Sequence, residues 1–158
     1  MVKRILGLMV LLFAQQAWAG ANDVVVDKVW MRESVPEQQS VTVQMNLSVT
    51  KAARLLSVSS PIATSGEIQG VVMRRGKMQT STVDSMKLAA HSTIIFGTRG
   101  VYLVLNGLNK VLNVGDRIPV TLVLEIAGKK QTVNTEAEVK ALELSYKHYQ
   151  DPSVKDHR

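Results

Sequence analysis

The side chains of this sequence that suit a soft metal ion are methionine thioethers and histidine imidazoles. The chain holds seven Met, three His and no Cys, so it offers no thiolate. Met73 and Met78 flank the polar segment 74–77, and His91 follows two alanines at an expected turn. These three residues are candidate metal ligands. We prefer the alternative, in which both Met residues fill gaps in a core and His91 is a solvated loop residue.

Motifs for catalysis are missing from the sequence. No serine lies in a Gly-x-Ser-x-Gly elbow, and no glycine-rich phosphate loop is present. Glu67 and Asp84 are separate carboxylates, and nothing near them in sequence pairs them as acid and base. We therefore predict that the protein is not an enzyme.

Arg74, Arg75 and Lys77 form a basic segment at an expected hairpin tip. Charged turns are common on protein surfaces, so the preferred interpretation is that these residues keep the turn solvated. The alternative is a docking site for an acidic partner.

The first nineteen residues have the layout of a secretory signal peptide. Lys3 and Arg4 precede an apolar run from 5 to 14, and the segment ends in Ala17-Trp18-Ala19. This pattern predicts cleavage after Ala19 and an exported protein, with retention as an N-terminal anchor as the alternative. No later apolar stretch approaches the length of about 20 residues that a spanning helix needs, so no membrane span is expected after cleavage.

The charge of the exported part is mildly basic. Loss of Lys3 and Arg4 leaves 17 basic and 13 acidic residues, a net charge of +4. Export and an aromatic fraction of 4% argue against nucleic acid as a partner. We expect one domain over residues 20–143, followed by a polar tail over residues 144–158.

Alternation of apolar and polar residues predicts β-strands along the exported part. Apolar residues occupy every second position from Val41 to Val49 and from Ile118 to Ile126, which is typical of half-buried strands. Ala127-Gly128-Lys129-Lys130 and Gly97-Thr98-Arg99-Gly100 read as turns, as does Val114-Gly115-Asp116. Further strands are expected at 24–32, 54–59, 66–73, 77–83, 92–96, 101–105 and 133–139. Many short strands separated by turns favour an all-β protein, either an antiparallel sandwich or a small barrel.

Three segments of the chain carry a family resemblance. They are Val29-Trp30-Met31-Arg32, the run 55–61, and the run 102–108 with its continuation to Leu122. The third reads Tyr-Leu-Val-Leu-Asn-Gly-Leu and then Gly-Asp-Arg-Ile-Pro-Val-Thr-Leu. It resembles the His-Leu-Met-Leu-x-Gly-Leu and Gly-Asp-x-Val-Pro-Leu-Thr-Leu segments of the PCu(A)C family of periplasmic copper chaperones. The resemblance covers roughly residues 23–139.

This resemblance implies a cupredoxin-like β-sandwich in the periplasm, Cu(I) as the bound ion, and a periplasmic protein partner. The four ligands of the family, a His and a Met followed by a His-x-Met pair, align with Gln69, Thr80, Tyr102 and Val104. Gln, Thr and Tyr are harder donors than imidazole and thioether, and Val has no donor, so this set should bind Cu(I) poorly.

Two functions follow as expectations. The first is a periplasmic copper-chaperone-like protein in copper handling or copper-enzyme assembly, acting through Met73, Met78 and His91 or by docking to a partner. The alternative is a family member without metal that serves as a periplasmic protein-binding or assembly module. In that case, the positions of the former ligands form the binding patch.

Overall fold

The structure is a computed structural model that describes residues 23–98 and 100–141. The expected signal peptide, residues 1–19, and the expected tail, residues 144–158, lie outside the described residues. The described part is built from strands, and it contains no helix long and apolar enough to cross a bilayer.

Strands account for most of the described chain, and those at 24–32, 77–83 and 92–96 have the bounds that the sequence predicts. They are β1 (Val24–Arg32), β2 (Ser40–Val49), β3 (Ala53–Ser59), β4 (Ala63–Arg74), β5 (Lys77–Val83), β6 (Met86–Leu88), β7 (Ser92–Phe96), β8 (Val101–Leu108), β9 (Arg117–Ile126) and β10 (Lys129–Lys140). The sequence does not predict β6, because three residues are too few to show an alternating pattern.

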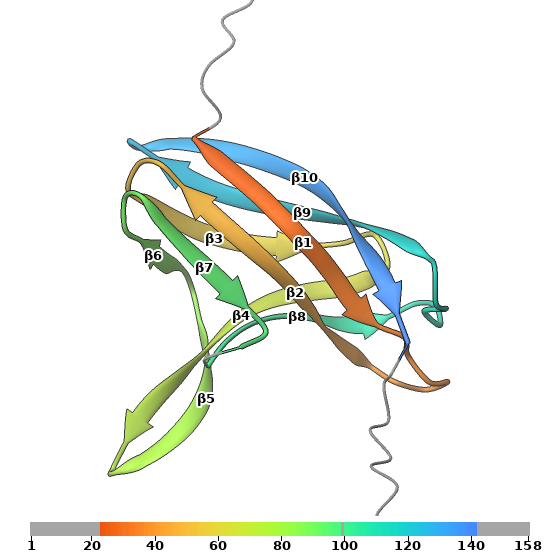
Figure 1. The fold of residues 1–158 in the computed structure, drawn as a ribbon. Coiled ribbons are helices and arrows are strands. Elements are labelled where there is room, and N and C mark those ends of the chain that lie inside the picture. The colour runs from red at the N-terminus through yellow and green to blue at the C-terminus, as the bar shows by residue number, and fades with distance from the viewer. Residues whose placement is uncertain (1–22, 99, 142–158) are drawn as a thin grey trace, which may run out of the picture.

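The strands form one sheet in the order β5-β4-β8-β2-β1-β10-β9-β3-β6, with β7 paired to β2. β2 pairs with β8 along its first half and with β7 along its second half. The pairing of β1 with β10 is parallel, and the other pairings are antiparallel. The sheet wraps around one apolar interior, and the β4–β5 hairpin projects from it (Figure 1). The all-β, antiparallel prediction is confirmed.

Alternation places the apolar residues of β2 and β9 in the interior. Val43 and Leu47 of β2 are fully buried, as are Leu122 and Leu124 of β9. Each such side chain stabilises the fold by roughly 1.5–3 kcal/mol relative to an exposed one. Because side chains of a strand alternate between faces, this burial sets the register of β2 and β9 against their neighbours.

Two tight hairpins are closed by two-residue turns. Ala127 and Gly128 have φ values of 49° and 75°, and Arg75 and Gly76 have values of 50° and 74°. Positive φ at both central residues is the geometry of a type I′ turn, whose twist matches that of paired strands. The predicted turn at 127–130 is therefore confirmed, and only its first two residues form the loop.

The segments that carry the family resemblance hold neighbouring parts of the chain together. The buried Ser60 hydroxyl donates a 2.6 Å hydrogen bond to the carbonyl of Pro119. The side-chain amide of Asn109 donates to the carbonyl of Pro61 at 3.0 Å. Gly107 has a φ of 68°, and a Cβ there would collide with the Thr64 side chain. These residues therefore have structural roles.

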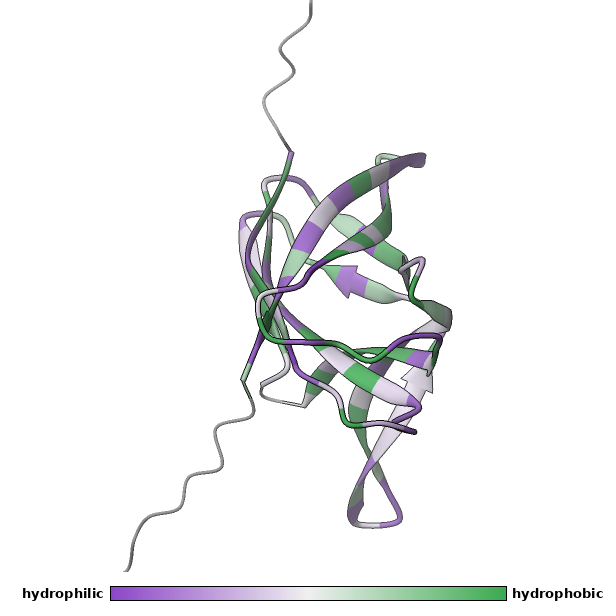
Figure 2. Cartoon of the chain, turned by 90° about the vertical axis from the view of Figure 1, so that its right-hand side faces the viewer, coloured by the Kyte–Doolittle hydropathy of each residue, from purple (hydrophilic) through white to green (hydrophobic). Residues whose placement is uncertain are grey.

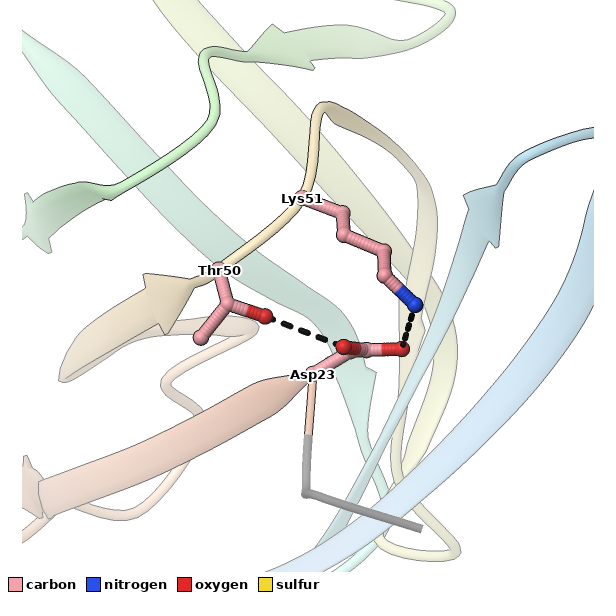
Figure 3. Close-up of polar contacts among 3 residues, drawn as sticks. All are labelled: Asp23, Thr50 and Lys51. Carbon is pink, nitrogen blue, oxygen red and sulfur yellow. Dashed lines mark hydrogen bonds and ion pairs between the residues drawn. The ribbon is translucent and has the colours of Figure 1, made fainter.

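The start of β1 is fixed by the carboxylate of Asp23. This group accepts hydrogen bonds from Lys51 Nζ and Thr50 Oγ1, both at 3.0 Å (Figure 3). The backbone N–H of Thr50 also donates to the Asp23 carbonyl at 3.0 Å. The Lys51 bond, helped by the Thr50 bond, lowers the pKa of Asp23 below its usual value. These contacts hold the beginning of β1 against the end of β2.

Candidate functional site

The projecting part of the molecule is the distal half of the β4–β5 hairpin, residues 71–80, which we call the arm. β4 pairs with β8 as far as Gly70, opposite Val101. Beyond that point, β4 pairs with β5 alone, through four successive residue pairs that end at the Arg75-Gly76 turn. The arm consequently extends away from the sandwich (Figure 1).

Met73 and Met78 form one of these pairs, directly opposite each other across the arm. Their exposed fractions are 71% and 73%. The preferred interpretation that they fill the core is therefore wrong. The reason is that Met73 has the parity of Gln69 and so lies on the face of β4 opposite to the buried Ile68, and that only β5 pairs with β4 beyond Gly70. Directly opposite residues share one face of a sheet, and both thioethers are available to a ligand in solvent.

His91 is not part of this pair. It lies exposed, with a φ of 54°, in the turn between β6 and β7. Those two strands pair with β3 and β2, and Figure 1 shows their connection far above the tip of the arm. The prediction of a solvated loop histidine is confirmed. The structure does not bring His91 to Met73 and Met78.

The four positions aligned with the family ligands lie on one face of the β5-β4-β8 sheet. Gln69 of β4 is directly opposite Tyr102 of β8, and Val104 follows two residues later on the same face. Thr80 of β5 is opposite Val71, which is two residues from Gln69. Since residues two apart share a face, the four side chains form one patch at the base of the arm.

A carboxylate that sequence analysis treated as separate lies within this patch. Oε2 of Glu67 accepts hydrogen bonds from Gln69 Nε2 at 3.1 Å and from Thr82 Oγ1 at 3.0 Å. Glu67 and Gln69 are two apart on β4, and Thr82 is opposite Gln69. The parity of Glu67 and Gln69 could have indicated the first bond. The second depends on the hairpin register. This cluster offers hard oxygen and amide groups, which do not suit Cu(I).

A groove of about 320 Å³ borders the patch on its β2 side. Tyr102 belongs to both surfaces, since it lines the groove and lies opposite Gln69. The groove is lined by Arg32, Gln38, Ser40, Val41, Thr42, Gln44, Gly97 and Tyr102. Most of the residues that line it are polar, and Tyr102 supplies a large amphipathic ring of the kind enriched in protein interfaces.

Positive charge is concentrated at the tip of the arm. Arg74, Arg75 and Lys77 are exposed, and with Gln79 they line a hollow of about 400 Å³. No acidic residue occurs in the sequence between Glu67 and Asp84. Figure 2 shows the hydrophilic colour at this tip. Within residues 23–98 and 100–141, no group of three or more His, Cys, Asp or Glu side chains could hold a metal.

Residues 24–139 match the family described as "Putative lipoprotein LpqE-like". The chain belongs to the LpqE-like family. The match spans the sheet from β1 almost to the end of β10, so the family likeness concerns the whole sandwich. Comparison with curated protein sequences finds no match.

Solved structures of two PCuAC domains and of DR1885 share the fold of this LpqE-like chain. The apo PCuAC domain from PmoF1 is 21% identical, with a TM-score of 0.61 over 76% of this chain and 95% of that one. The copper-bound PCuAC domain from PmoF2 is 21% identical, with a TM-score of 0.60 over 76% and 94%. The Cu(I) form of DR1885 from Deinococcus radiodurans is 25% identical, with a TM-score of 0.58 over 80% and 85%.

These matches confirm the resemblance to the PCu(A)C copper chaperones and the cupredoxin-like β-fold. Two of the three structures contain copper by their own descriptions. The LpqE-like chain thus has the fold of PCuAC domains, with Gln69, Thr80, Tyr102 and Val104 on one face and an exposed methionine pair on the arm.

Proposed function

We propose that this protein takes part in copper handling outside the cytoplasm and binds Cu(I) through Met73 and Met78. The observation that carries the proposal is the position of the two thioethers. They lie directly opposite each other on neighbouring strands and expose 71% and 73% of their surface. Met side chains commonly fill cores, so exposure of a facing pair calls for another role.

The chemistry of the pair suits a soft ion. Thioether sulfur selects Cu(I), and it is neutral at every physiological pH, so binding does not require loss of a proton. The Cβ atoms of directly opposite residues lie about 4.5–5.5 Å apart, which allows two long, flexible side chains to converge on one ion. An exposed, two-sulfur site should release its metal readily, as a carrier must.

The compartment is part of the proposal. The signal-peptide layout of residues 1–19 supports export to the periplasm, with residues 20–143 as the exported domain and 144–158 as a tail. Membership of a family described as lipoproteins and likeness to PCuAC domains support a place outside the cytoplasm. In this setting the partner is a periplasmic protein that supplies or receives copper.

A Cu(I) titration under reducing conditions tests the proposal. The exported domain should compete with a chromophoric Cu(I) chelator for one equivalent of metal, and Met73→Leu/Met78→Leu should abolish this competition. Met86→Leu is the matched control, because Met86 lies half-buried on β6 and outside the arm. Equal metal binding by the wild type and the double variant would contradict the assignment of the arm.

A second candidate function has its own supporting observation. The face that carries the family ligand positions also carries a hydrogen-bonded cluster of Glu67, Gln69 and Thr82, next to Tyr102 and Val104. This polar patch with one aromatic ring supports a metal-free module that binds a protein or peptide. The same titration separates the two candidates, because the module predicts no Cu(I) binding by the wild type. Neither candidate is an enzyme.

A further inference from the structure

We propose that the arm docks an acidic, extended segment of a partner protein, which adds to the sheet as a new strand along β5. The proposal deepens the proposed function, since it assigns a partner to the part of the molecule that would hold the metal. The docking itself depends on the edge, charge and apolar surface of the arm, and it requires no copper.

The first support is the free edge of β5. This strand begins the sheet order and pairs with β4 alone. Its seven residue pairs follow without a register shift, and the strand contains no Pro. Proteins usually protect long edges with bulges, Pro or short strands, and apart from Lys77 and the charged turn β5 lacks such devices. An extended peptide can pair with an edge of this kind through its main chain.

The second support is charge. Three cations, Arg74, Arg75 and Lys77, are exposed at the end of the arm. The acidic group at the base, Glu67, already accepts hydrogen bonds from Gln69 and Thr82. The arm therefore presents an uncompensated positive end, which selects acidic partners and speeds their association.

The third support is the apolar pair behind the cations. Met73 and Met78 share one face of the arm and are mostly exposed. Arg74 and Lys77 form the next residue pair and therefore lie on the opposite face of the arm, and Met adapts to varied partners. Side chains of an added strand alternate between faces, so the fitting segment alternates acidic and apolar residues.

A membrane surface fits this geometry less well. The outermost residues of the arm are Arg75 and Gly76, and the methionines lie behind them. Insertion of the methionines into a bilayer would first carry the charged turn into the apolar region, which is costly. A protein strand beside β5 meets the cations and the methionines together.

The experiment measures binding of a fluorescent ten-residue peptide that alternates Glu and Val. A peptide with Lys in place of Glu is the ligand control. Arg74→Glu/Lys77→Glu removes the cations that flank the turn. Lys129→Glu/Lys130→Glu is the matched protein control, because it changes the charge equally at the other two-residue hairpin. We expect the arm variant to bind the Glu peptide at least tenfold more weakly, and the control variant to change less than twofold.

Amide hydrogen exchange locates the bound peptide. Saturation with the Glu peptide should slow exchange at residues 77–83 and leave the edge strand β6 unchanged. Equal binding by the arm variant, equal binding of the Lys peptide, or protection elsewhere would overturn the proposal. The proposal would also be overturned if the protein bound anionic phospholipid vesicles and not the Glu peptide, or if it bound neither the vesicles nor the peptide.

The Met73→Leu/Met78→Leu variant separates this proposal from copper binding. Leu keeps the apolar surface, so peptide binding should persist while Cu(I) binding is lost. Peptide binding by a wild type that binds no Cu(I) would reject the copper function and leave the docking intact. Cu(I) binding by a wild type that does not bind the peptide would reject the docking and leave the copper function intact.

Discussion

Met73 and Met78 lie directly opposite each other on β4 and β5, beyond the point at which β8 stops covering β4. The arm projects from the sheet because β8 no longer pairs with β4 beyond Gly70. Ile68 points to the interior and is 3% exposed, whereas Met73 has the parity of Gln69, lies on the other face of β4 and, with Met78, exposes 71% and 73%. One hairpin therefore serves the core at its base and presents two soft donors at its tip.

The cations beside the methionines should weaken Cu(I) binding by repulsion. Two unit charges about 10 Å apart in water interact by about 0.4 kcal/mol, so Arg74→Gln/Lys77→Gln should tighten Cu(I) binding about fourfold at low salt. Because salt screens exposed charges, the difference should shrink at about 0.5 M salt. Chelator competition at two salt concentrations measures both effects. The control variant Lys129→Gln/Lys130→Gln should show neither the tighter Cu(I) binding nor its dependence on salt. An unchanged Cu(I) affinity of Arg74→Gln/Lys77→Gln would contradict the role of the charges.

The face at the base of the arm should accept a metal site if the family ligands are restored. Gln69→His, Thr80→Met, Tyr102→His and Val104→Met together place two imidazoles and two thioethers on one face. We expect at least a hundredfold gain in Cu(I) affinity in a Met73→Leu/Met78→Leu background, where the arm cannot contribute. The matched control carries Asn and Leu at the restored His and Met positions. A folded four-ligand variant with no gain would mean that these positions do not converge.

Gly66 should be essential for the contact between β4 and β3. A Cβ at Gly66 would lie closer than 3.0 Å to the backbone carbonyl of Val58, whereas a Cβ at Gly70 would meet open space. Gly66→Ala should therefore lower the free energy of unfolding by about 2–3 kcal/mol, as overpacking commonly does. Gly70→Ala should change it by less than about 0.5 kcal/mol. Urea unfolding compares the two, and equal effects would contradict the close approach of these strands.

Asp23 should contribute stability that depends on pH. Hydrogen bonds from Lys51 and Thr50 lower the pKa of its carboxyl below the ordinary value of 3.8, so folding favours the carboxylate. Its contribution is present above that ordinary value and is lost as the pH falls through the lowered folded pKa. Asp23→Asn should therefore reduce the urea midpoint at neutral pH and differ less from the wild type below about pH 4. Thr50→Val keeps the Lys51 ion pair and should lose only part of the effect. A gap between wild type and Asp23→Asn that does not change with pH would reject this linkage.

Most of the fold could be predicted from the sequence, because burial on one face leaves a period of two. Val41 to Val49 and Ile118 to Ile126 show that period without interruption, and both runs form strands that are buried on one face. The edge strand β6 spans only Met86–Leu88 and carries no such pattern. Strands at the edge of a sheet need little alternation, so they are the hardest to recognise.

The candidate site was harder to predict, because it depends on which strands end where. The residue type of Met73 favours a core position, but Met73 lies on the face opposite to the buried Ile68 and beyond the end of β8 pairing at Gly70. The bond from Thr82 to Glu67 joins residues fifteen apart, and the hairpin register that joins them is set by the Arg75-Gly76 turn. The alternation of residues along β4 and β5 predicts correctly which side chains share a face. The end of β8 pairing at Gly70 and the hydrogen bonds of Glu67 are seen only in the structure.

The most direct test of the copper assignment is the NMR spectrum of methionine methyl groups labelled with carbon-13. One equivalent of Cu(I), added under reducing conditions, should shift the methyl signals of Met73 and Met78 and leave those of the buried Met31 and Met45 in place. Shifts confined to other methionines, or an unchanged spectrum, would contradict the proposal that the arm carries copper.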